Sequence, residues 1–536
     1  MHGNTSHENR EIPGFSRRTR SRAGAGAQRE VERRTPLMHE SGKSDSRVVP
    51  KKVPNKARRR VAEGLEGRRL AKRNRPQATT FRTQGRARVD VALGRVRQAA
   101  EQKKGERFTA LLHHIYAIDT LRAAFHGLER DAAPGVDGET WEHYGQALKL
   151  NLADLSERVR RGAYRPQPVR RVYIPKRGDA QQQRPIGVTA LEDKIVQRAT
   201  VMVLNAVYEP EFAGFSYGAR PGRNAHQALT ALDQAIEKKR VKWVLDADLR
   251  DFFGSLEHTQ LIRFVEHRIG DKRVVRLIGQ WLAAGVLEDG AWTQSETGTP
   301  QGGSISPLAA NLYMHYVFDV WAQRWRRTEA RGEVVIVRYL DDFIVGFQYR
   351  TDAEQFLIVL RERLGQFGLT LHPDKTRLLE FGRYAAQNRQ ERGQRKPETF
   401  QFLGLVHSCG RTRKGEFRVH RHTAADRLRA KLREVKAELR RRRHDPVPEV
   451  GHYLAAVVRG HCQYYGIPGN GRAIARFRDE VNRHWHRALS RRSQKGSVRW
   501  ERMKRLIQRF IPPARIAHPS SWVLFAVMTQ GRSPVR

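Results

Sequence analysis

Two runs of apolar residues with strong strand propensity flank a short polar step around residue 340. The runs cover residues 334–337 and 343–347, and the step between them contains Tyr339, Asp341 and Asp342. This pattern is typical of a β-hairpin. It predicts two adjacent carboxylates at the tip of two rigid strands, where a divalent metal would find oxygen ligands. A polar surface turn is the alternative interpretation of such a pair.

A second acidic stretch lies upstream, at residues 241–258. Its apolar start predicts a strand that ends at Asp248 and is followed by a turn or a helix. Two-metal phosphoryl transfer needs carboxylates from separate elements, because the attacking and the leaving oxygen must both be held in line. Asp248 and Asp341 would supply such a pair, with Asp342 nearby. Because Asp248 and Asp341 lie far apart along the chain, only the tertiary fold can bring them together.

Positive charge dominates the composition of this chain of 536 residues. Its 101 Lys and Arg against 56 Asp and Glu give a formal net charge of +45. A charge of this size opposes a compact isolated state and attracts polyanions, so we expect nucleic acid as the partner. An anionic membrane surface and a structural role of the ribosomal type are the alternatives.

The sequence contains no run of about 18 apolar residues and no apolar segment behind the basic N-terminus. It therefore predicts neither a membrane span nor a secretory signal, and the expected location is cytoplasmic. The two cysteines, Cys409 and Cys462, are too few for a zinc knuckle or a disulfide framework. We expect both to be buried thiols.

The charge divides the chain into three parts. Residues 1–80 hold 21 basic and 8 acidic residues, a net +13, with little apolar periodicity, which predicts a mostly disordered tail. Residues 81–410 have a net charge of +10 and contain nearly all the strand and helix signals, so they should form the globular core. Residues 411–536 hold 31 basic and 9 acidic residues, a net +22, and keep helical periodicity. They are expected to form a folded basic module.

One helix of that module is marked by apolar residues at helical spacing: Leu428, Leu432, Val435 and Leu439. Arginines and lysines cover its other faces, and Pro446 and Pro448 are expected to end it. The charge favours a helix that lies along a nucleic-acid backbone over a solvated helix packed on the core.

Eight segments in a fixed order point to a known family. They are YIPK at 173–176, RPIGVT at 184–189, EDKIVQRA at 192–199, SYGARPGR at 216–223, the Asp248 stretch, GTPQGGSISP at 298–307, YLDD at 339–342 and FLG at 402–404. In this order they resemble a group II intron-encoded reverse transcriptase and maturase, from about residue 85 to residue 536. Ala219, Leu340, Asp251 and Gly254 depart from the family pattern, the last two as an apparent exchange of Gly and Asp. None of these departures removes an expected metal ligand.

The resemblance implies an α+β fold built as a right-hand polymerase. Fingers and a palm with a mainly antiparallel sheet are expected in residues 81–410. A helical thumb and a basic α-helical maturase module are expected in residues 411–536. The resemblance also implies that Asp248, Asp341 and Asp342 are catalytic and bind two Mg²⁺ ions, with the Leu249 carbonyl as a backbone ligand.

Further substrate contacts follow from the same resemblance. Lys176 and Arg184 would hold the incoming triphosphate, although more residues than usual separate them. Phe253 would place its ring against the sugar C2′ and favour deoxynucleotides. Gln301 would contact the nascent base pair or the template, and Lys375 would donate a proton to pyrophosphate. The alternatives are ordinary surface cations, a core aromatic and a turn.

The C-terminal part carries the resemblance to maturases, in VRGH at 458–461, YYG at 464–466 and an arginine-rich run from 472 to 509. The candidates for RNA contact are Arg459, His461, Tyr464, Tyr465 and Arg472. Phe477, Trp485 and Trp500 are interleaved with the arginines. Guanidinium and aromatic groups together can neutralise phosphates and stack on unpaired bases. Buried aromatics that pack helices are the alternative.

The expected function is RNA-directed DNA synthesis combined with binding of the chain's own intron RNA, to assist splicing and retrohoming. The expected partners are group II intron RNA, a DNA target or primer and dNTPs, without a membrane; whether the protein forms a homodimer is open. The expected location is the bacterial cytoplasm, with nucleoid association as an alternative. The competing functions are a splicing cofactor with a dormant polymerase and a bacterial reverse transcriptase for defence or diversification.

Overall fold

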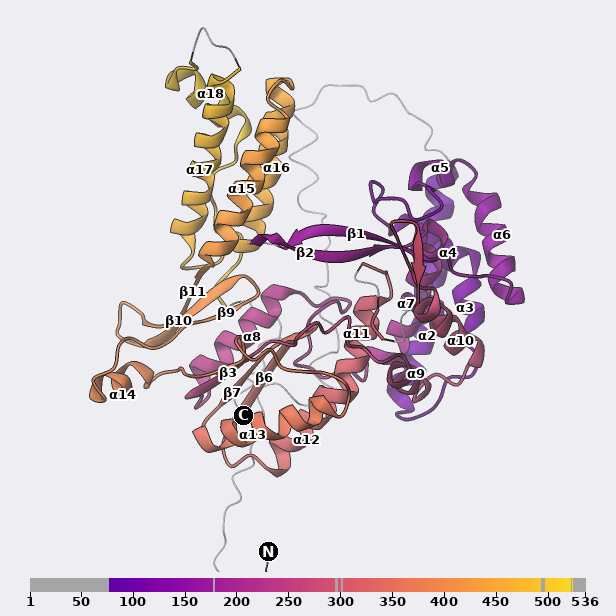
Figure 1. Ribbon diagram of the computed structural model, residues 1–536, viewed down its shortest axis with the longest axis horizontal. Helices are drawn as coiled ribbons and strands as arrows, with labels where there is room; N and C mark the ends of the chain where they lie inside the picture. The colour runs from indigo at the N-terminus through magenta and orange to yellow at the C-terminus, as the bar shows by residue number, and fades with distance from the viewer. Residues whose placement is uncertain are drawn as a thin grey trace, which may run out of the picture.

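The structure is a computed structural model that describes residues 77–176, 179–294, 297–299, 302–492, 497–521 and 523. Side chains are described from residue 85 onward, except at 175–182. Most of the tail expected to be disordered, residues 1–80, lies outside the described residues, and helix α2 (Gln77–Gln102) begins near its end. Figure 1 shows a violet helical part, a central sheet with helices on both faces, and an orange-yellow helical bundle.

The first part is mostly helical. Its helices are α2, α3 (Leu112–Tyr116), α4 (Ile118–His126), α5 (Trp141–Gln146), α6 (Leu148–Arg161), α7 (Leu191–Tyr208), α9 (His258–Glu266) and α10 (Lys272–Ala283). Helix α7 is central, because α2, α3 and α4 all pack on it and its Ile195 and Val203 are fully buried.

A four-stranded sheet belongs to this first part. Its strands are β1 (Val169–Lys176), β2 (Asp179–Val188), β4 (Val286–Glu288) and β5 (Ala291–Thr293), in the order β2-β1-β4-β5. Strands β1 and β2 pair antiparallel as a long hairpin. In Figure 1 this hairpin extends from the violet helices toward the bundle, so it spans the space above the central sheet.

The central sheet has the order β6-β7-β3-β8, and all its neighbours pair antiparallel. Its strands are β3 (Trp243–Ala247), β6 (Val334–Tyr339), β7 (Asp342–Phe347) and β8 (Arg377–Glu380). Helix α8 (Ala225–Lys238) covers one face. The other face is covered by α11 (Ser306–Met314), the π-helix η1 (His315–Asp319), α12 (Val320–Thr328) and α13 (Arg350–Gly365).

Alternation of side chains explains why the strands of this sheet read as continuous apolar runs. Val335 and Val337 of β6 pack with α8, whereas Ile336 between them packs with the opposite core. Successive residues of a strand point to opposite faces. Because both faces are covered, both sets of residues must be apolar. The expected antiparallel sheet and the expected hairpin around residue 340 are confirmed.

The last part contains a second small sheet and a helical bundle. The sheet has the order β11-β10-β9 and consists of β9 (Phe400–Phe402), β10 (Leu405–Arg411) and β11 (Phe417–Thr423), preceded by α14 (Ala385–Glu391). The bundle is formed by α15 (Ala425–Arg441), α16 (Val447–Tyr465), α17 (Gly471–Ser490) and α18 (Trp500–Phe510). It has its own apolar core around the fully buried Trp485.

The predicted helix at residues 428–439 is α15, and its apolar stripe is buried in the bundle core. The two prolines behave differently from the expectation. Pro446 precedes α16 and Pro448 lies in its first turn, where a missing N–H has no helical partner to lose. The small sheet spans the boundary placed between residues 410 and 411, because β10 crosses it and β11 follows it. Among the described residues, no helix is both long and apolar enough to cross a membrane.

Candidate active site

Three acidic side chains from two parts of the chain meet at one end of the central sheet. The β6–β7 register pairs Tyr339 with Asp342, so Asp341 occupies the tip of the hairpin. The β3–β7 register ends with Ala247 opposite Phe343, which places Asp248 beside Asp342 at the same end. The structure therefore brings together the carboxylates that the sequence alone left far apart.

The carboxylates influence one another electrostatically. Burial raises the pKa of Asp341 above its usual value, and the negative charge of Asp248 raises it further. Burial also raises the pKa of Asp342 well above its usual value, and Asp341, Asp246 and Asp248 add to this effect. Like charges held together in a low dielectric favour the protonated form. A cation between such carboxylates would offset their mutual repulsion.

A buried guanidinium group, that of Arg338, supports the turn that carries Asp341. Arg338, fully buried, donates to Asp319 at 2.7 and 2.5 Å, to Asn311 Oδ1 at 3.1 Å and to the Leu340 carbonyl at 2.8 Å. Leu340 has a φ of +61°, a conformation that non-glycine residues adopt rarely. The hydrogen bond to its carbonyl fixes this strained residue directly before Asp341. Asp319 lies in η1, and π-helical turns occur often at functional sites.

A second segment presses against the same turn. Tyr217 N–H donates to the Arg338 carbonyl at 2.9 Å, so the chain around Gly218 runs alongside the hairpin tip. A Cβ at Gly218 would come within 2.5 Å of the Leu340 nitrogen. This close approach requires glycine at position 218 and restricts the movement of the turn.

Leu249 forms an isolated antiparallel β-bridge with Leu371, but its carbonyl takes no part in the hydrogen bonds of that bridge. The bridge between Leu249 and Leu371 is made by two hydrogen bonds, from Arg250 N–H to Thr370 O at 2.9 Å and from His372 N–H to Asp248 O at 2.8 Å. In this type of antiparallel pair the two opposed residues use neither of their own groups. The backbone next to Asp248 is thus fixed while the Leu249 oxygen stays available for a ligand.

Two of the predicted substrate cations lie at this end of the sheet. Lys375 Nζ is 2.7 Å from Asp248 Oδ2, in an ion pair whose side chains are 62 % and 37 % exposed. Arg184 is exposed on β2, and its charge partly offsets the effects that raise the pKa of Asp341, of which burial is the largest. Lys176 ends β1, but its side chain lies outside the described residues. Gln301 also lies outside them.

Phe253 is partly buried beside Phe252, at 5.3 Å between ring centroids, in the turn that follows Asp248. The same turn explains the apparent exchange of Gly and Asp. Asp251 has a φ of +40°, a conformation in which glycine is usual. A Cβ at Gly254 would come within 2.3 Å of Asp251 Oδ2, so Gly254 makes room for the displaced carboxylate.

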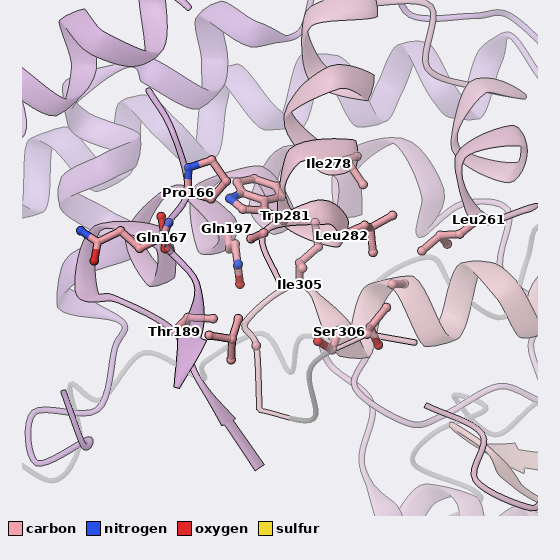
Figure 2. A pocket seen from close by; sticks show the side chains of 16 residues that line it. Pro166, Gln167, Thr189, Gln197, Leu261, Ile278, Trp281, Leu282, Ile305 and Ser306 are labelled. Carbon is pink, nitrogen blue, oxygen red and sulfur yellow. Dashed lines mark hydrogen bonds between the residues drawn. The ribbon is translucent and has the colours of Figure 1, made fainter. Parts of the chain in front are cut away.

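A small cavity of about 20 Å³ lies among α7, α10 and the residues that lead into α11, and Figure 2 shows Trp281, Ile305, Thr189 and Gln197 lining it. Thr189 Oγ1 and Gln197 Oε1 are buried there without a hydrogen-bond partner among the described residues. A cavity of this size holds about one water molecule and is far too small for a nucleotide.

The donor set fits Mg²⁺, a hard cation that is usually held by one or two carboxylates and by substrate phosphates. Within the described ranges, no group of three or more His, Cys, Asp or Glu side chains is arranged to hold a metal ion as it stands. The ion pair of Asp248 with Lys375 agrees with this finding, because an ammonium group occupies the carboxylate. The residues that could hold the ions are Asp248, Asp341, Asp342 and the Leu249 carbonyl.

The five candidates for RNA contact differ in how exposed they are. Arg459 on α16 and Arg472 on α17 are exposed. His461 is only 7 % exposed and stacks on Phe477 at 3.7 Å, and burial lowers its pKa to about 4. It is a neutral packing residue of the bundle in this structure, as are the fully buried Phe477 and Trp485.

The two tyrosines connect the bundle to the turn between β9 and β10 of the small sheet. Tyr464 Oη donates to the Leu403 carbonyl at 3.0 Å, and the negative charge of Asp342 is among the minor effects that raise its pKa to about 12, burial being the largest. Tyr465 packs edge-on against Tyr464, at 4.8 Å, and its hydroxyl lies beside Gly404. Trp500 is 47 % exposed and stacks on His486 at 4.3 Å, so it remains accessible.

The part of the chain that carries this geometry has known relatives. A family model described as reverse transcriptase (RNA-dependent DNA polymerase) matches residues 174–407. Protein YkfC of Escherichia coli K12 is 33 % identical over 319 residues, which cover 53 % of this chain and 78 % of that protein. The group II intron-encoded protein LtrA of Lactococcus lactis is 31 % identical over 223 residues. The chain belongs to the reverse transcriptases of group II introns.

The match to LtrA covers 42 % of this chain and 37 % of LtrA, so the chain spans just over a third of that relative. The nuclear intron maturase 3 of Arabidopsis thaliana is 31 % identical over 124 residues, 23 % of this chain. Both the reverse transcriptase and the maturase side of the resemblance therefore have named relatives.

Sequence reasoning missed three residues around the site of this reverse transcriptase. Asp246 lies one strand period before Asp248 and forms an ion pair with Arg377 at 3.2 Å. Arg338 supports the turn before Asp341. The charge of Arg427 on α15 partly counters the effects that raise the pKa of Asp342, the largest of which is burial. Of the three residues, only Arg338 could have been found from the sequence, because a charged residue within an apolar strand is unusual.

Proposed function

We propose that this protein is an RNA-directed DNA polymerase that also binds its group II intron RNA and assists splicing and retrohoming. The observation that carries the proposal is the meeting of Asp248, Asp341 and Asp342 at one end of an antiparallel sheet, with Arg184 and Lys375 beside them. On this proposal the central sheet is the palm, the violet helices with the β1–β2 hairpin are the fingers, and the bundle provides the thumb and maturase region.

The chain's own residues have distinct roles in this proposal. When bound, two Mg²⁺ ions would help the primer 3′-oxygen attack the α-phosphate and would stabilise the leaving pyrophosphate. Asp248, Asp341, Asp342 and the Leu249 carbonyl would hold them. Arg184, together with Lys176, would hold the triphosphate through guanidinium and ammonium groups. Phe253 would exclude a 2′-hydroxyl, and Gln301 would contact the nascent pair or the template.

Lys375 would change partner during the reaction. In this structure its ammonium group neutralises Asp248. A cation at the carboxylates would take over that role, and Lys375 Nζ would then be free to give a proton to the leaving pyrophosphate oxygen. The exposed position of its side chain allows this movement.

The RNA-binding part of the proposal is supported by the +22 net charge of residues 411–536 and by the exposed arginines of the bundle. Arg459 and Arg472 are placed to contact phosphates, and Trp500 is exposed enough to stack on a base. Tyr464 and Tyr465, held at the junction with the palm, would transmit the position of the bundle to the active site.

The test is primer extension on an RNA template with Mg²⁺, using Asp341→Ala and the control Asp374→Ala. Asp374 is an exposed acid beside Lys375, so both substitutions remove one carboxylate near the same entrance. We expect Asp341→Ala to abolish DNA synthesis and to leave RNA affinity nearly unchanged, and Asp374→Ala to remain active. Continued synthesis by Asp341→Ala would refute the active-site assignment. An inactive wild-type protein that still promotes splicing would make it a splicing cofactor alone.

A further inference from the structure

A large concave surface lies away from the candidate active site, between the palm and the small sheet. It has a volume of about 1290 Å³ and is bounded by α8, α14, the β10–β11 hairpin and the segment around Ser521. Figure 1 shows β10, β11 and α14 on the left of the molecule, whereas the fingers lie on the right. We call this surface the hairpin groove. It exceeds the roughly 300–1,000 Å³ of sites for small ligands, so a polymer is the better fit.

The hairpin groove is basic. Its lining includes six Lys and Arg side chains against three Asp and Glu, and two histidines: Lys238, Arg383, Arg411, Arg413, Arg418, Arg421, Asp233, Glu237, Glu416, His420 and His422. Strand alternation places Arg418, His420 and His422 together on the exposed face of β11, while Val419 and Arg421 point inward. Gly410 on β10 has no side chain, which makes room for the His420 ring.

Arg413 and Arg418 are the cations best placed for an external partner. Both are exposed and lie in or next to the β10–β11 turn. Neither guanidinium group forms a hydrogen bond or an ion pair with a described residue. By contrast, Arg421 is buried in an ion pair with Asp233 at 2.8 Å, and Arg383 donates to the Glu237 carbonyl at 3.3 Å. Two guanidinium groups thus face solvent with their donors unused by the described chain.

An aromatic ring stands at the same groove. Tyr384 is 51 % exposed at the start of α14, and Lys242 Nζ lies 6.0 Å from its ring centroid. An exposed ring next to guanidinium groups can stack on an unpaired base while the cations neutralise phosphates. A polyanion without bases would bind through the guanidinium groups alone and would leave the exposed ring unused. The ring together with the cations therefore suits a nucleic acid better.

The groove has a firm floor. Arg421 Nη2 donates to Ser521 Oγ at 2.7 Å, Ser521 Oγ donates to Asp233 Oδ2 at 2.9 Å, and Val419 N–H donates to Glu237 Oε1 at 3.0 Å. These bonds join β11, α8 and the segment around Ser521. The floor does not need a ligand to hold its shape, so a partner would find the groove preformed.

The chain's own tails are poor occupants for such a groove. Residues 1–80 carry a net charge of +13, and the residues after 523 include two arginines and no acid. Basic segments would be repelled by the exposed arginines. An external polyanion would be attracted to them.

We propose that the hairpin groove binds a segment of RNA, with phosphates on Arg413 and Arg418 and an unpaired base on Tyr384. The choice of RNA rests on the proposed function, and the inference adds a second RNA surface on the side of the palm away from the fingers. RNA held there would extend the contact made by the bundle and leave the polymerase cleft open for template and primer.

The test compares matched double variants of the full chain. Arg413→Ala/Arg418→Ala removes two of the six groove cations, and the control Arg324→Ala/Arg361→Ala removes two exposed arginines from α12 and α13. The probe is a fluorescein-labelled RNA hairpin with an unpaired loop, added to protein preloaded with unlabelled primer–template. Its affinity is measured by anisotropy over a series of salt concentrations, with a duplex DNA of the same stem sequence as a second probe.

We expect the groove variant to lose about tenfold in RNA affinity relative to the control variant. The slope of log affinity against log salt should fall by about 0.7 for each phosphate that is no longer neutralised. Tyr384→Leu should cost about fivefold or more because base stacking is removed, whereas Tyr349→Leu, another exposed tyrosine, should have no effect. Primer extension on a short annealed primer–template should stay at the wild-type rate for all four variants.

Equal RNA affinity of the groove and control variants would overturn the proposal. A loss of affinity for duplex DNA alone would also overturn it and assign the groove to DNA. The test is independent of the polymerase assignment, because a wild-type protein that failed to extend primers would refute the proposed function while the RNA comparison kept its meaning. Circular dichroism and melting temperature identify a variant that has failed to fold, and Tyr384→Leu then decides the question.

Discussion

At the scale of single residues, Arg338 connects the stability of the central sheet to the geometry of the turn that carries Asp341. Arg338 is fully buried and forms an ion pair with Asp319, which is also buried. It also donates a hydrogen bond to the carbonyl of Leu340, whose φ is positive. A buried ion pair adds little net stability compared with apolar residues of the same size, but breaking one half of it is costly. Its function here is to set the position of Asp341.

This role makes a prediction that separates stability from activity. Arg338→Met should lower the free energy of unfolding by about 3–5 kcal/mol, because it leaves Asp319 buried and unpaired. Arg338→Met/Asp319→Leu should recover most of that loss, because no unpaired charge remains. DNA synthesis should stay low in the double variant, because the Leu340 carbonyl still lacks its donor. Urea unfolding and single-turnover primer extension measure the two effects. Recovery of both stability and synthesis would contradict a positioning role.

Gly218 gives a second prediction at this scale. A Cβ there would lie 2.5 Å from the Leu340 nitrogen, so Gly218→Ala must displace the hairpin tip. We expect a loss of about 1–3 kcal/mol in unfolding free energy and a clear drop in synthesis rate. Gly279→Ala is the matched control. Gly279 lies within α10 with open space where a methyl group would stand, so this change should stabilise the protein by roughly 0.5–1 kcal/mol. Equal effects of the two substitutions would contradict the close-approach argument.

At the scale of elements, Asp271 shows how one carboxylate joins segments that are distant in sequence. It caps α10 through Arg273 N–H and accepts from Leu111 N–H and Leu112 N–H at 2.9 and 3.0 Å. Burial alone would raise its pKa, but the side chain of Arg273 and these backbone donors lower it to about 2. The segment before α3 and the start of α10 are therefore fixed to each other by an ionised group.

The acid stability of the protein should report this link. Because the pKa of Asp271 is lower in the folded state than its usual value near 4, its stabilising effect is present above about pH 4 and is lost as the pH falls toward 2. Asp271→Asn should reduce stability by about 1–2 kcal/mol at pH 7 and flatten the acid limb of the stability curve. Thermal unfolding at a series of pH values measures this. Asp131→Asn, at an exposed acid, should leave the curve unchanged, and a similar flattening there would argue against a specific role for Asp271.

At the scale of the whole molecule, local patterns predicted well and long-range ones did not. The hairpin at residue 340 and helix α15 follow from periodicity over a few residues, and the structure contains both. The pairing of β3 with β7 joins residues about a hundred positions apart, and it was indicated by the needs of two-metal chemistry and by the order of family motifs, not by any local pattern. The burial of His461 and the hydrogen bonds below the hairpin groove could not be predicted either, because both depend on contacts between residues that are distant in sequence. Composition identifies a basic surface but cannot say which cations are buried.

A prediction at this scale concerns the segment around Ser521, which returns from the bundle to α8. Ser521 is buried and lies between Arg421 and Asp233, accepting from the first and donating to the second. Ser521→Ala should cost about 1–3 kcal/mol of unfolding free energy, because it leaves two buried charged groups short of a partner. Ser520→Ala, one position earlier and half-buried, should cost less than about 0.5 kcal/mol, as is usual for substitutions away from such networks. Denaturant unfolding of the full chain tests both, and equal costs would contradict the assignment.

The return of the chain from the bundle to the central sheet has a mechanical consequence. The bundle is joined to the rest of the protein where α15 follows β11, through Tyr464 at the Leu403 carbonyl, and again after α18, where His518 stacks on His226 of α8 at 3.7 Å and Ser521 reaches Asp233. A body held at one point can pivot freely, whereas each added point of attachment removes a direction of movement. Loss of the attachment at His518 and Ser521 would therefore leave the bundle freer to rotate about β11 and Leu403.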